Sequence, residues 1–439
     1  MTSWWCEYAW VGSAPVASVR VVAHSGVVTS VETGVPASDG DERLRGLVLP
    51  GFANAHSHAF HRALRGRTHG SGGTFWTWRE QMYAVAARLD PDSYLRLARA
   101  VYAEMALAGV TCVGEFHYLH HAPGGARYDE PNAMGEALRQ AAGDAGIRIT
   151  LLDACYLSGG LSSDGHLPLD PVQQRFGDGS AEAWASRVGQ LAPDATLRLG
   201  AAVHSVRAVP RDALPEVASA FPDAPLHVHL SEQQAENDAA LAHYGRTPTQ
   251  LLADAGALGA RTTAVHATFS PGIDILGGSG TRICACPTTE RDLADGIGPM
   301  RLLVTAGSPL CLGSDSHAVI DLLEEARALE MHERLATRRR GSFSPAELVD
   351  ALTADGHAAL GWPEAGRIET AAPADLVAVR LDSVRTAGST PEQLVLAASS
   401  PDVHTVVVGG RTVVRDGAHA LGDVGALLCD AVSSLWADA

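Results

Sequence analysis

The most constraining feature of this sequence is a regular alternation of short apolar segments with longer segments of helical periodicity, from about Leu49 to about Leu360. The short segments are rich in β-branched residues, so each pair predicts a β-strand followed by a helix. In one such helix Asp90 suits the N-cap, Pro91 suits the first turn, and apolar side chains recur on one face until Gly109. The expected strands end near His56, Glu115, Leu152, Val203, His229, His266, Cys286 and Gly313. Eight units of this kind close a parallel barrel, so we predict an α/β protein with a (β/α)8 TIM-like barrel.

The two ends of the chain have a different pattern. Residues 16–33 and 44–48 at one end, and 374–379 with 404–414 at the other, are strand-like and are separated by glycine turns. Neither end is large enough to form its own core, so we expect both ends to combine into one small β-sandwich beside the barrel. The predicted domains are therefore a composite β-sandwich of residues 1–48 plus 367–439 and a barrel of residues 49–366. Residues 158–165 and 341–344 are predicted to be loops.

The composition argues against several classes of function. The formal net charge of -17 at pH 7 disfavours binding to nucleic acid or to an anionic membrane, since both need clustered positive charge. Seven cysteines without a CxxC pair indicate buried thiols in a reducing compartment. The first residues lack the basic and apolar regions of a signal peptide, and no segment has the length of a transmembrane helix, so we expect a cytoplasmic enzyme. The sequence contains no lysine, which excludes lysine Schiff bases and carboxylated-lysine metal bridges.

Two histidines one residue apart follow the first expected strand, in LPGFANAHSHAFH. Side chains two positions apart on an extended segment project from the same side, so His56 and His58 can reach one ion. An isolated HxH pair is weak evidence, because such pairs also arise by chance in a sequence with 19 histidines. The pair becomes informative because it lies at the C-terminal end of a barrel strand, where barrel enzymes assemble their active sites.

Other potential metal ligands end other expected strands. His229 ends the strand in PLHVHLSE, His266 ends the strand in TTAVHAT, and Asp315 follows the strand in SPLCLGSDSH. His227 lies one layer deeper in the barrel, so we expect an interior histidine there. Imidazoles and a carboxylate in this arrangement predict an open zinc site with one position left for water. Such an ion lowers the pKa of bound water from 15.7 to about 7, which supplies hydroxide at neutral pH.

Glu232 lies three residues after His229, close enough to sit beside the ion without binding it. This position suits a proton shuttle, and general acid-base chemistry of this kind typically contributes about 10²- to 10⁴-fold in rate. The alternative for Glu232 is a solvated glutamate at the start of a helix. The alternative for Asp315 is a helix cap, the usual role of an aspartate in such a turn.

This set of residues resembles the amidohydrolase superfamily. HxH after the first strand, HxxE after the fifth, His after the sixth and Asp after the eighth is its pattern, in the variant without a bridging lysine that is typical of aminohydrolases and deaminases. The resemblance implies one zinc ion per subunit, with iron as the alternative, and four metal ligands: His56, His58, His229 and Asp315. It also implies that metal-bound hydroxide attacks the substrate. In that reaction Asp315 takes the proton from the water, Glu232 passes it to the leaving nitrogen, and His266 polarises the addition intermediate.

Longer motifs narrow the resemblance to the formimidoylglutamate deiminases within that superfamily. They are PGFANAHSHAFHRALRG, FWTWREQMY, GEFHYLHH, HSVRAV, HLSEQ, CPTTERDLADGI and LGSDSH, and they run in order from residue 50 to residue 317. FWTWRE and EFHYLHH are the most specific, because they recur in this family and not across the superfamily. The resemblance implies a homodimer that acts in histidine degradation. Its reaction converts N-formimino-L-glutamate and water into N-formyl-L-glutamate and ammonia.

The same resemblance implies a set of substrate-binding positions: His61, Arg79, Tyr118, His204 and Arg207. Formiminoglutamate has two carboxylates, and the planar fork of arginine binds a carboxylate bidentately. An arginine chosen at random more often makes a weak surface ion pair. The sequence departs from the family at His61, where the family has glutamine; an imidazole is shorter and can carry charge, which leaves the exact substrate open. Residues 286–296 also differ slightly from the family and have no predicted role.

Two other functions stay open. Another aminohydrolase of this superfamily, acting on a purine, a pyrimidine or a related amidine, would be favoured by aromatic residues that stack near a strand end. The pair Arg79 and Arg207 instead favours a small anionic substrate. A catalytically silent metal-binding or scaffolding protein is the third interpretation, but binding alone would not require Glu232, His266 and Asp315 together.

Overall fold

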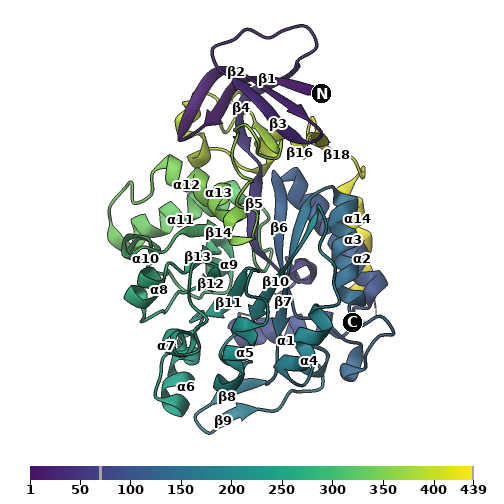
Figure 1. Ribbon diagram of the computed structural model, residues 1–439, viewed down its shortest axis with the longest axis vertical. Helices are drawn as coiled ribbons and strands as arrows, with labels where there is room; N and C mark the ends of the chain where they lie inside the picture. The colour runs from purple at the N-terminus through teal and green to yellow at the C-terminus, as the bar shows by residue number, and fades with distance from the viewer. Residues whose placement is uncertain (69–71, 438–439) are drawn as a thin grey trace.

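The computed structural model describes residues 1–68 and 72–437, and its larger part is a parallel eight-stranded barrel (Figure 1). In order around the barrel the strands are β14 (Leu310–Leu312), β13 (Arg282–Ala285), β12 (Thr262–His266), β11 (Leu226–Leu230), β10 (Leu197–Val203), β7 (Arg148–Cys155), β6 (Val110–His117) and β5 (Phe52–Ser57). A parallel bridge between Ser57 and Asp315 joins the two ends of this sheet. The predicted (β/α)8 fold is therefore confirmed, and every strand ends within three residues of its predicted end.

Helices alternate with the strands and cover the outside of the barrel (Figure 1). They are α1 (Phe75–Ala86), α2 (Pro91–Leu107), α3 (Ala133–Ala145), α4 (Ala181–Val188), α5 (Leu214–Ser219), α6 (Gln234–Tyr244), α7 (Pro248–Asp254), α8 (Ile273–Ser279), α9 (Pro287–Asp292), α10 (Met300–Ala306), α11 (Leu322–Thr337), α12 (Pro345–Leu352) and α13 (Ala354–Ala359). Short 3-10 segments are η1 (Ala59–Leu64), η2 (Pro123–Gly125), η3 (Gln173–Arg175), η4 (Arg211–Ala213), η5 (Pro391–Leu396) and η6 (Ser400–Asp402). The start of α2 is as predicted: the Asp90 side chain accepts a hydrogen bond from the Ser93 amide at 2.7 Å, and Pro91 occupies the first turn.

Both ends of the chain form a second sheet, which lies at the top of Figure 1. Its strands, in spatial order, are β18 (Ala418–His419), β17 (Arg411–Arg415), β16 (Val403–Val408), β15 (Leu376–Val379), β4 (Glu42–Pro50), β1 (Thr2–Val11), β2 (Ala14–His24) and β3 (Val27–Glu32). β4 joins the two ends, because it pairs in parallel with β1 and antiparallel with β15. The two ends thus build one mixed sheet beside the barrel. The exact domain boundaries stay a prediction; the chain passes from this sheet into the barrel between Pro50 and Phe52.

Two elements differ from the sequence prediction. Residues 158–165 are not simply a loop, because β8 (Gly160–Ser162) and β9 (Gly165–Leu167) form a small hairpin there. Ser163 and Asp164 form its two-residue turn, and Gly165 is paired with Ser162 directly after it. The final helix, α14 (Val424–Trp436), leaves the mixed sheet and packs against α2 of the barrel (Figure 1). The Trp436 indole donates a hydrogen bond to the Ala63 carbonyl at 3.1 Å and so attaches the end of the chain to the barrel.

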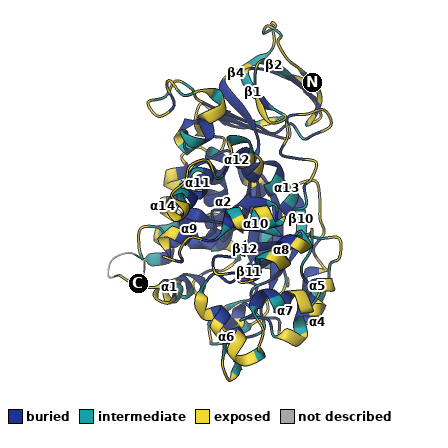
Figure 2. Cartoon of the chain, turned by 90° about the vertical axis from the view of Figure 1, so that its left-hand side faces the viewer, coloured by how far each residue is buried: buried dark blue, intermediate teal, exposed yellow. Residues whose placement is uncertain are grey.

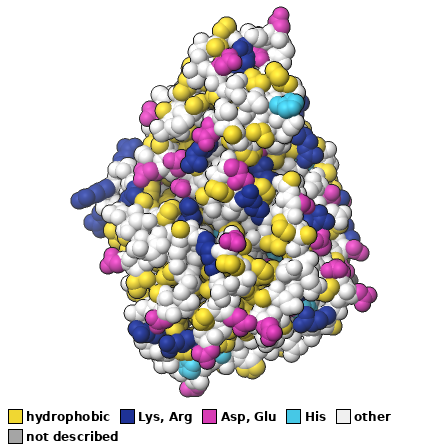
Figure 3. Space-filling model, in the orientation of Figure 1, with side chains coloured by type: hydrophobic (Ala, Val, Ile, Leu, Met, Phe, Trp, Pro, Cys, Tyr) yellow, Lys and Arg dark blue, Asp and Glu magenta, His cyan; other side chains and the backbone are white. Residues whose placement is uncertain are grey.

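Burial follows the barrel architecture (Figure 2). Every residue of β5, β6 and β7 is buried, as expected for parallel strands that are covered on both faces. Arginine and acidic side chains are intermingled on the face shown in Figure 3. Within residues 1–68 and 72–437, no helix combines the length and the apolar character needed to cross a membrane.

Candidate active site

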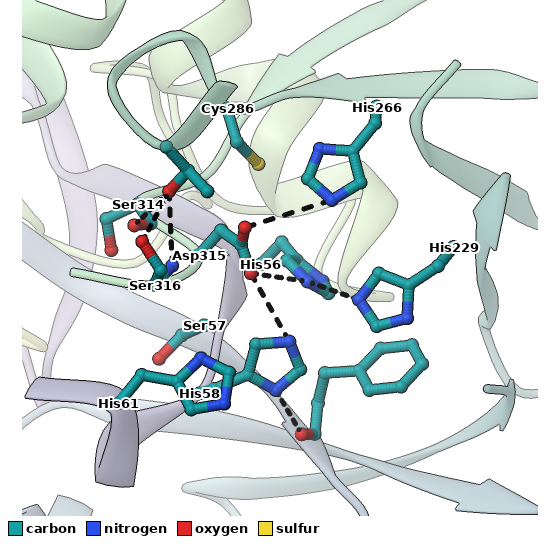
Figure 4. A network of polar contacts seen from close by, with 12 residues as sticks. His56, Ser57, His58, His61, His229, His266, Cys286, Ser314, Asp315 and Ser316 are labelled. Carbon is teal, nitrogen blue, oxygen red and sulfur yellow. Dashed lines mark hydrogen bonds and ion pairs between the residues drawn. The ribbon is translucent and has the colours of Figure 1, made fainter. Parts of the chain in front are cut away.

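Four side chains from three parts of the barrel converge at the C-terminal ends of its strands (Figure 4). His56 lies on β5, His58 follows that strand directly, His229 lies on β11, and Asp315 follows β14. Oδ1 of Asp315 lies 3.3 Å from Nε2 of His56 and 3.3 Å from Nε2 of His58. Nε2 of His229 lies 3.1 Å from Nε2 of His56, and all four side chains are buried. The structure thus brings together the four residues that were predicted as metal ligands.

Hydrogen bonds at Nδ1 of His58 and His229 determine which nitrogen of each ring faces the cluster. Nδ1 of His58 lies 2.9 Å from the Phe116 carbonyl, and Nδ1 of His229 lies 2.9 Å from the His204 carbonyl. A carbonyl oxygen can only accept, so in both rings Nδ1 carries the proton and Nε2 offers a lone pair to the cluster. Burial lowers the pKa of His229 well below its ordinary value and lowers the pKa of His56 to about 3, so both rings are neutral at pH 7.

The donor set fits a divalent cation. Three imidazoles and one carboxylate aim at the same point, and a neutral imidazole lone pair is a ligand that zinc binds well. Without a cation, the His229 lone pair would face the His56 ring at close range in a buried space. The set forms a His/Asp metal site, and a fifth coordination position on a bound cation would be left for a water molecule.

The closure of the barrel holds Asp315 in place. Its amide donates to the His56 carbonyl at 3.0 Å, and its carbonyl accepts from the His58 amide at 3.2 Å. Asp315 has φ of 41° and His266 has φ of 70°, a left-handed backbone that non-glycine residues rarely adopt outside functional sites. Burial acts to raise the pKa of Asp315, but its contacts with His56 and His58 outweigh burial and hold that pKa well below the usual range.

His266 lies among carboxylates next to the cluster. Its Nε2 is 3.7 Å from Oε1 of Glu232 and 3.8 Å from Oδ2 of Asp315, and its Nδ1 is 3.4 Å from Oε1 of Glu290. Burial acts to lower the pKa of His266, but these carboxylates outweigh burial and raise it to about 10. Burial raises the pKa of Glu232. The pair therefore combines a cationic imidazole with a carboxyl group that can gain or lose a proton.

The predicted substrate-binding residues line one pocket with the metal cluster. Its wall includes His61, Arg79, Tyr118, His204 and Arg207, together with Glu232 and His266. Nε2 of His61 lies 2.9 Å from the Tyr118 hydroxyl, so the residue that departs from the family pattern is hydrogen-bonded to another predicted substrate contact. Burial lowers the pKa of His61 well below its ordinary value, so His61 is uncharged at neutral pH.

The two predicted arginines are held in different ways. Arg207 donates from Nε to Oε2 of Glu236 at 2.7 Å, while its Nη2 lies 4.0 Å from Oε2 of Glu232. The guanidinium of Arg79 lies 5.2 Å from the ring centre of Trp76 and 5.1 Å from that of Tyr83. Stacking of this kind orients the cation without consuming its hydrogen-bond donors.

Several residues of the site were not identified from the sequence. Trp78, Tyr83, Tyr156 and Phe176 contribute aromatic walls to the pocket. Glu290 and Glu236 support His266 and Arg207 from helices α9 and α6. Glu290 belongs to the CPTTE motif, in a segment for which no role was predicted. The only sequence signal for a role of Glu290 in the site is its position shortly after a barrel strand. His227 is an interior histidine as expected, with Nε2 3.0 Å from the Ala359 carbonyl.

Comparisons with known proteins agree with this geometry. The profile of the Amidohydrolase family matches residues 47–413. The chain belongs to the amidohydrolase family. As a member it is a metal-dependent hydrolase, and its site without a lysine is of the deaminase type. The formimidoylglutamate deiminase of Pseudomonas aeruginosa is 38% identical over 419 residues, which cover 91% of each chain.

Solved structures extend the comparison. An amidohydrolase from Brucella melitensis superposes with a TM-score of 0.91 at 32% identity, covering 99% of this chain and 100% of that one. An adenosine deaminase from Xanthomonas campestris with bound zinc superposes with a TM-score of 0.82 at 22% identity, covering 100% and 98%. The latter shows the fold alone, and its zinc is a property of that protein.

Proposed function

We propose that this amidohydrolase removes the imino nitrogen of N-formimino-L-glutamate, with zinc as its metal, and releases N-formyl-L-glutamate and ammonia. The observation that carries the proposal is the presence of Arg79 and Arg207 in the same pocket as the metal cluster. Two guanidinium groups match the two carboxylates of this substrate. The 38% identity to a formimidoylglutamate deiminase over nearly the whole chain supports the same substrate.

The pocket suits a dianion bound at a distance from the reacting carbon. Arg207 uses Nε for Glu236, which leaves its Nη atoms as donors for a substrate carboxylate. Arg79 makes no ion pair with a carboxylate within residues 1–68 and 72–437, so its donors are also available. Both cations lie in a pocket that buries part of each side chain, where a charged hydrogen bond contributes more than at the surface.

The reaction forms one carbon-oxygen bond and breaks one carbon-nitrogen bond. A bound zinc ion would supply the Lewis acidity that brings the pKa of a water molecule close to neutrality. Asp315 takes a proton from the attacking water, and Glu232 passes it to the imino nitrogen. The second proton of that water reaches the same nitrogen by the same route as the carbon-nitrogen bond breaks, so the nitrogen leaves as ammonia and the oxygen stays on the formyl carbon. His266 Nε2, held as a cation among the carboxylates, donates a hydrogen bond to the oxygen that becomes the formyl oxygen.

One feature favours the alternative, an aminohydrolase that acts on a purine or pyrimidine. The aromatic walls formed by Trp78, Tyr156 and Phe176 could stack against a base. A neutral base, however, would leave the guanidinium of Arg79 and the outer nitrogens of Arg207, whose Nε already binds Glu236, without a carboxylate to bind, and unused charged donors in a partly desolvated pocket are costly. The arginine pair therefore favours the dicarboxylate.

The test measures ammonia released by the purified zinc-loaded protein from N-formimino-L-glutamate, cytosine, guanine and adenosine in parallel. We expect ammonia from formiminoglutamate alone. Release from one of the bases would support the alternative, and release from none with zinc bound would reject the proposed substrate. A formimino amino acid with a single carboxylate, N-formimino-4-aminobutyrate, should lose about 10- to 100-fold in kcat/KM, because one of the two guanidinium groups has no substrate carboxylate to bind.

A further inference from the structure

We propose that Cys286, His266 and Asp315 form a second metal site, beside the first one, that binds a thiophilic divalent cation such as Cd²⁺ or excess Zn²⁺ and inhibits the enzyme. One imidazole nitrogen, the Cys286 sulfur and one Asp315 oxygen lie within 4.8 Å of one another, and all three side chains are buried. Figure 4 shows the Cys286 sulfur directed toward the space between His266 and Asp315. The proposed reaction assigns no role to Cys286.

The two oxygens of Asp315 face different groups, which allows one carboxylate to serve both sites. Oδ1 lies 3.3 Å from Nε2 of both His56 and His58, whereas Oδ2 lies 3.8 Å from Nε2 of His266. The first cation therefore occupies the Oδ1 side and the second occupies the Oδ2 side. A carboxylate that bridges two cations keeps them close while reducing their mutual repulsion.

Glu290 orients the donors of the second site. Its Oε1 accepts the Cys286 amide at 3.0 Å and lies 3.4 Å from Nδ1 of His266. A proton on Nδ1 that points at this carboxylate leaves Nε2 of His266 to bind a cation once that nitrogen is deprotonated. Glu290 thus holds both the His266 imidazole and the Cys286 backbone in place. Metal ligands in proteins are usually oriented by hydrogen bonds of this kind.

The donor types select for a thiophilic ion. A thiolate, an imidazole and a carboxylate bind Zn²⁺ or Cd²⁺ more readily than Mg²⁺ or Ca²⁺, which prefer oxygen ligands alone. Oε1 of Glu232, 3.7 Å from Nε2 of His266, offers a fourth donor. Binding releases two protons to solvent, one from the Cys286 thiol and one from Nε2 of His266, and the carboxylates around His266 supply the negative charge that a second dication needs.

An ion at this position would stop turnover, because it would occupy His266, Glu232 and the free oxygen of Asp315. The inference concerns metal binding and does not depend on which substrate the enzyme uses. Failure of the metal-binding test and failure of the formiminoglutamate assay are therefore separate outcomes.

The experiment titrates zinc-loaded protein with Cd²⁺ and measures metal content by mass spectrometry together with the ultraviolet thiolate-to-cadmium absorption band. All proteins carry Cys429→Ser, because Cys429 is exposed while the other six thiols are buried. Cys286→Ser is the test variant and Cys284→Ser is the matched control, since Cys284 is a buried thiol of the same apolar cluster and is not one of the three donors. Retention of one tightly bound zinc shows that each variant is folded.

We expect a second metal equivalent with a thiolate band in the Cys286 parent and in Cys284→Ser, and neither in Cys286→Ser. The Cd²⁺ concentration that halves turnover should rise at least about 10-fold in Cys286→Ser, the scale on which losing a metal-site contact weakens binding. A single equivalent in the parent, a second equivalent without a thiolate band, or an unchanged band in Cys286→Ser would overturn the proposal.

Discussion

Nε of Arg207 lies 2.7 Å from Oε2 of Glu236, and this ion pair is almost fully buried, with side-chain exposures of 13% and 1%. The other oxygen of Glu236 accepts the Ser231 amide at 2.9 Å, so the glutamate is anchored to the segment that follows β11. The arginine is thereby fixed with its outer nitrogens in the pocket. Arg207 is therefore preorganised to bind an anion. Substituting it should weaken substrate binding and lower the stability of the fold, and the two effects can be measured separately.

Arg207→Met should raise KM for formiminoglutamate about 10- to 100-fold with a smaller change in kcat, because a substrate carboxylate loses a charged hydrogen bond that is worth about 1.5–3 kcal/mol. The measurement is steady-state ammonia release. Arg211→Met is the matched control, since Arg211 is exposed and lies 4.0 Å from Asp254 outside the pocket. An unchanged KM in Arg207→Met would remove this residue from substrate binding.

The same substitution should also lower the melting temperature, because it leaves the buried Glu236 carboxylate without its cation. Adding Glu236→Gln removes that charge, so the double variant should recover stability while KM stays high. Calorimetry and kinetics on the single and double variants separate the two effects. Recovery of KM together with stability would mean that Arg207 acts only through the fold.

Glu232→Gln should retain zinc and lose about 10²- to 10⁴-fold in kcat, because glutamine keeps the shape but cannot carry a proton to the leaving nitrogen. Metal content and turnover are measured on the same sample. Glu232 is not among the four converging ligand residues, so its loss should not release the ion. Full activity in this variant would contradict the assigned proton transfer.

Removal of the metal by a chelator should abolish turnover and lower the melting temperature. A ligand present at about 1,000 times its dissociation constant stabilises the native state by about 4 kcal/mol, and this contribution disappears with the ion. Loss of the cation also leaves the neutral imidazoles of His56 and His229 facing each other at 3.1 Å. Readdition of Zn²⁺ should restore both properties, and activity that persists in metal-free protein would reject a catalytic metal.

His61→Gln, which introduces the residue that the family resemblance leads one to expect at this position, should preserve metal binding and change KM by less than about 10-fold. Glutamine can make the same single hydrogen bond to Tyr118 that His61 makes at 2.9 Å, and one neutral hydrogen bond contributes about 0.5–1.5 kcal/mol. His61→Leu removes that bond and should raise KM more than His61→Gln does. A switch to a different substrate in His61→Gln would show that this position determines specificity.

The barrel and its ligand residues could be predicted because they follow local rules. His56 and His58 obey the period of an extended strand, His229 lies at the end of the apolar strand β11, and Asp315 follows the apolar strand β14 by three residues. Parallel strands place such ends on the same face of the barrel. Sequence periodicity therefore predicted that these residues lie on one face of the barrel, and the family resemblance selected these four as the metal ligands.

The supporting contacts could not be predicted, because tertiary packing alone creates them. Glu236 meets Arg207 across 29 positions of sequence, and Glu290 meets His266 across 24, with no periodic signal at either spacing. The packing of α14 against α2 also joins segments that lie far apart in the sequence. Only the three-dimensional arrangement selects the partner.

The most direct test of the account is the identity of the products formed from N-formimino-L-glutamate by the zinc-loaded protein in ¹⁸O-labelled water. Cleavage of the imino carbon-nitrogen bond predicts N-formyl-L-glutamate with the label in its formyl group and one equivalent of ammonia, measured by mass spectrometry and an ammonia assay. Formamide and L-glutamate as products would mean that the other carbon-nitrogen bond breaks. That result would contradict proton delivery by Glu232 to the imino nitrogen.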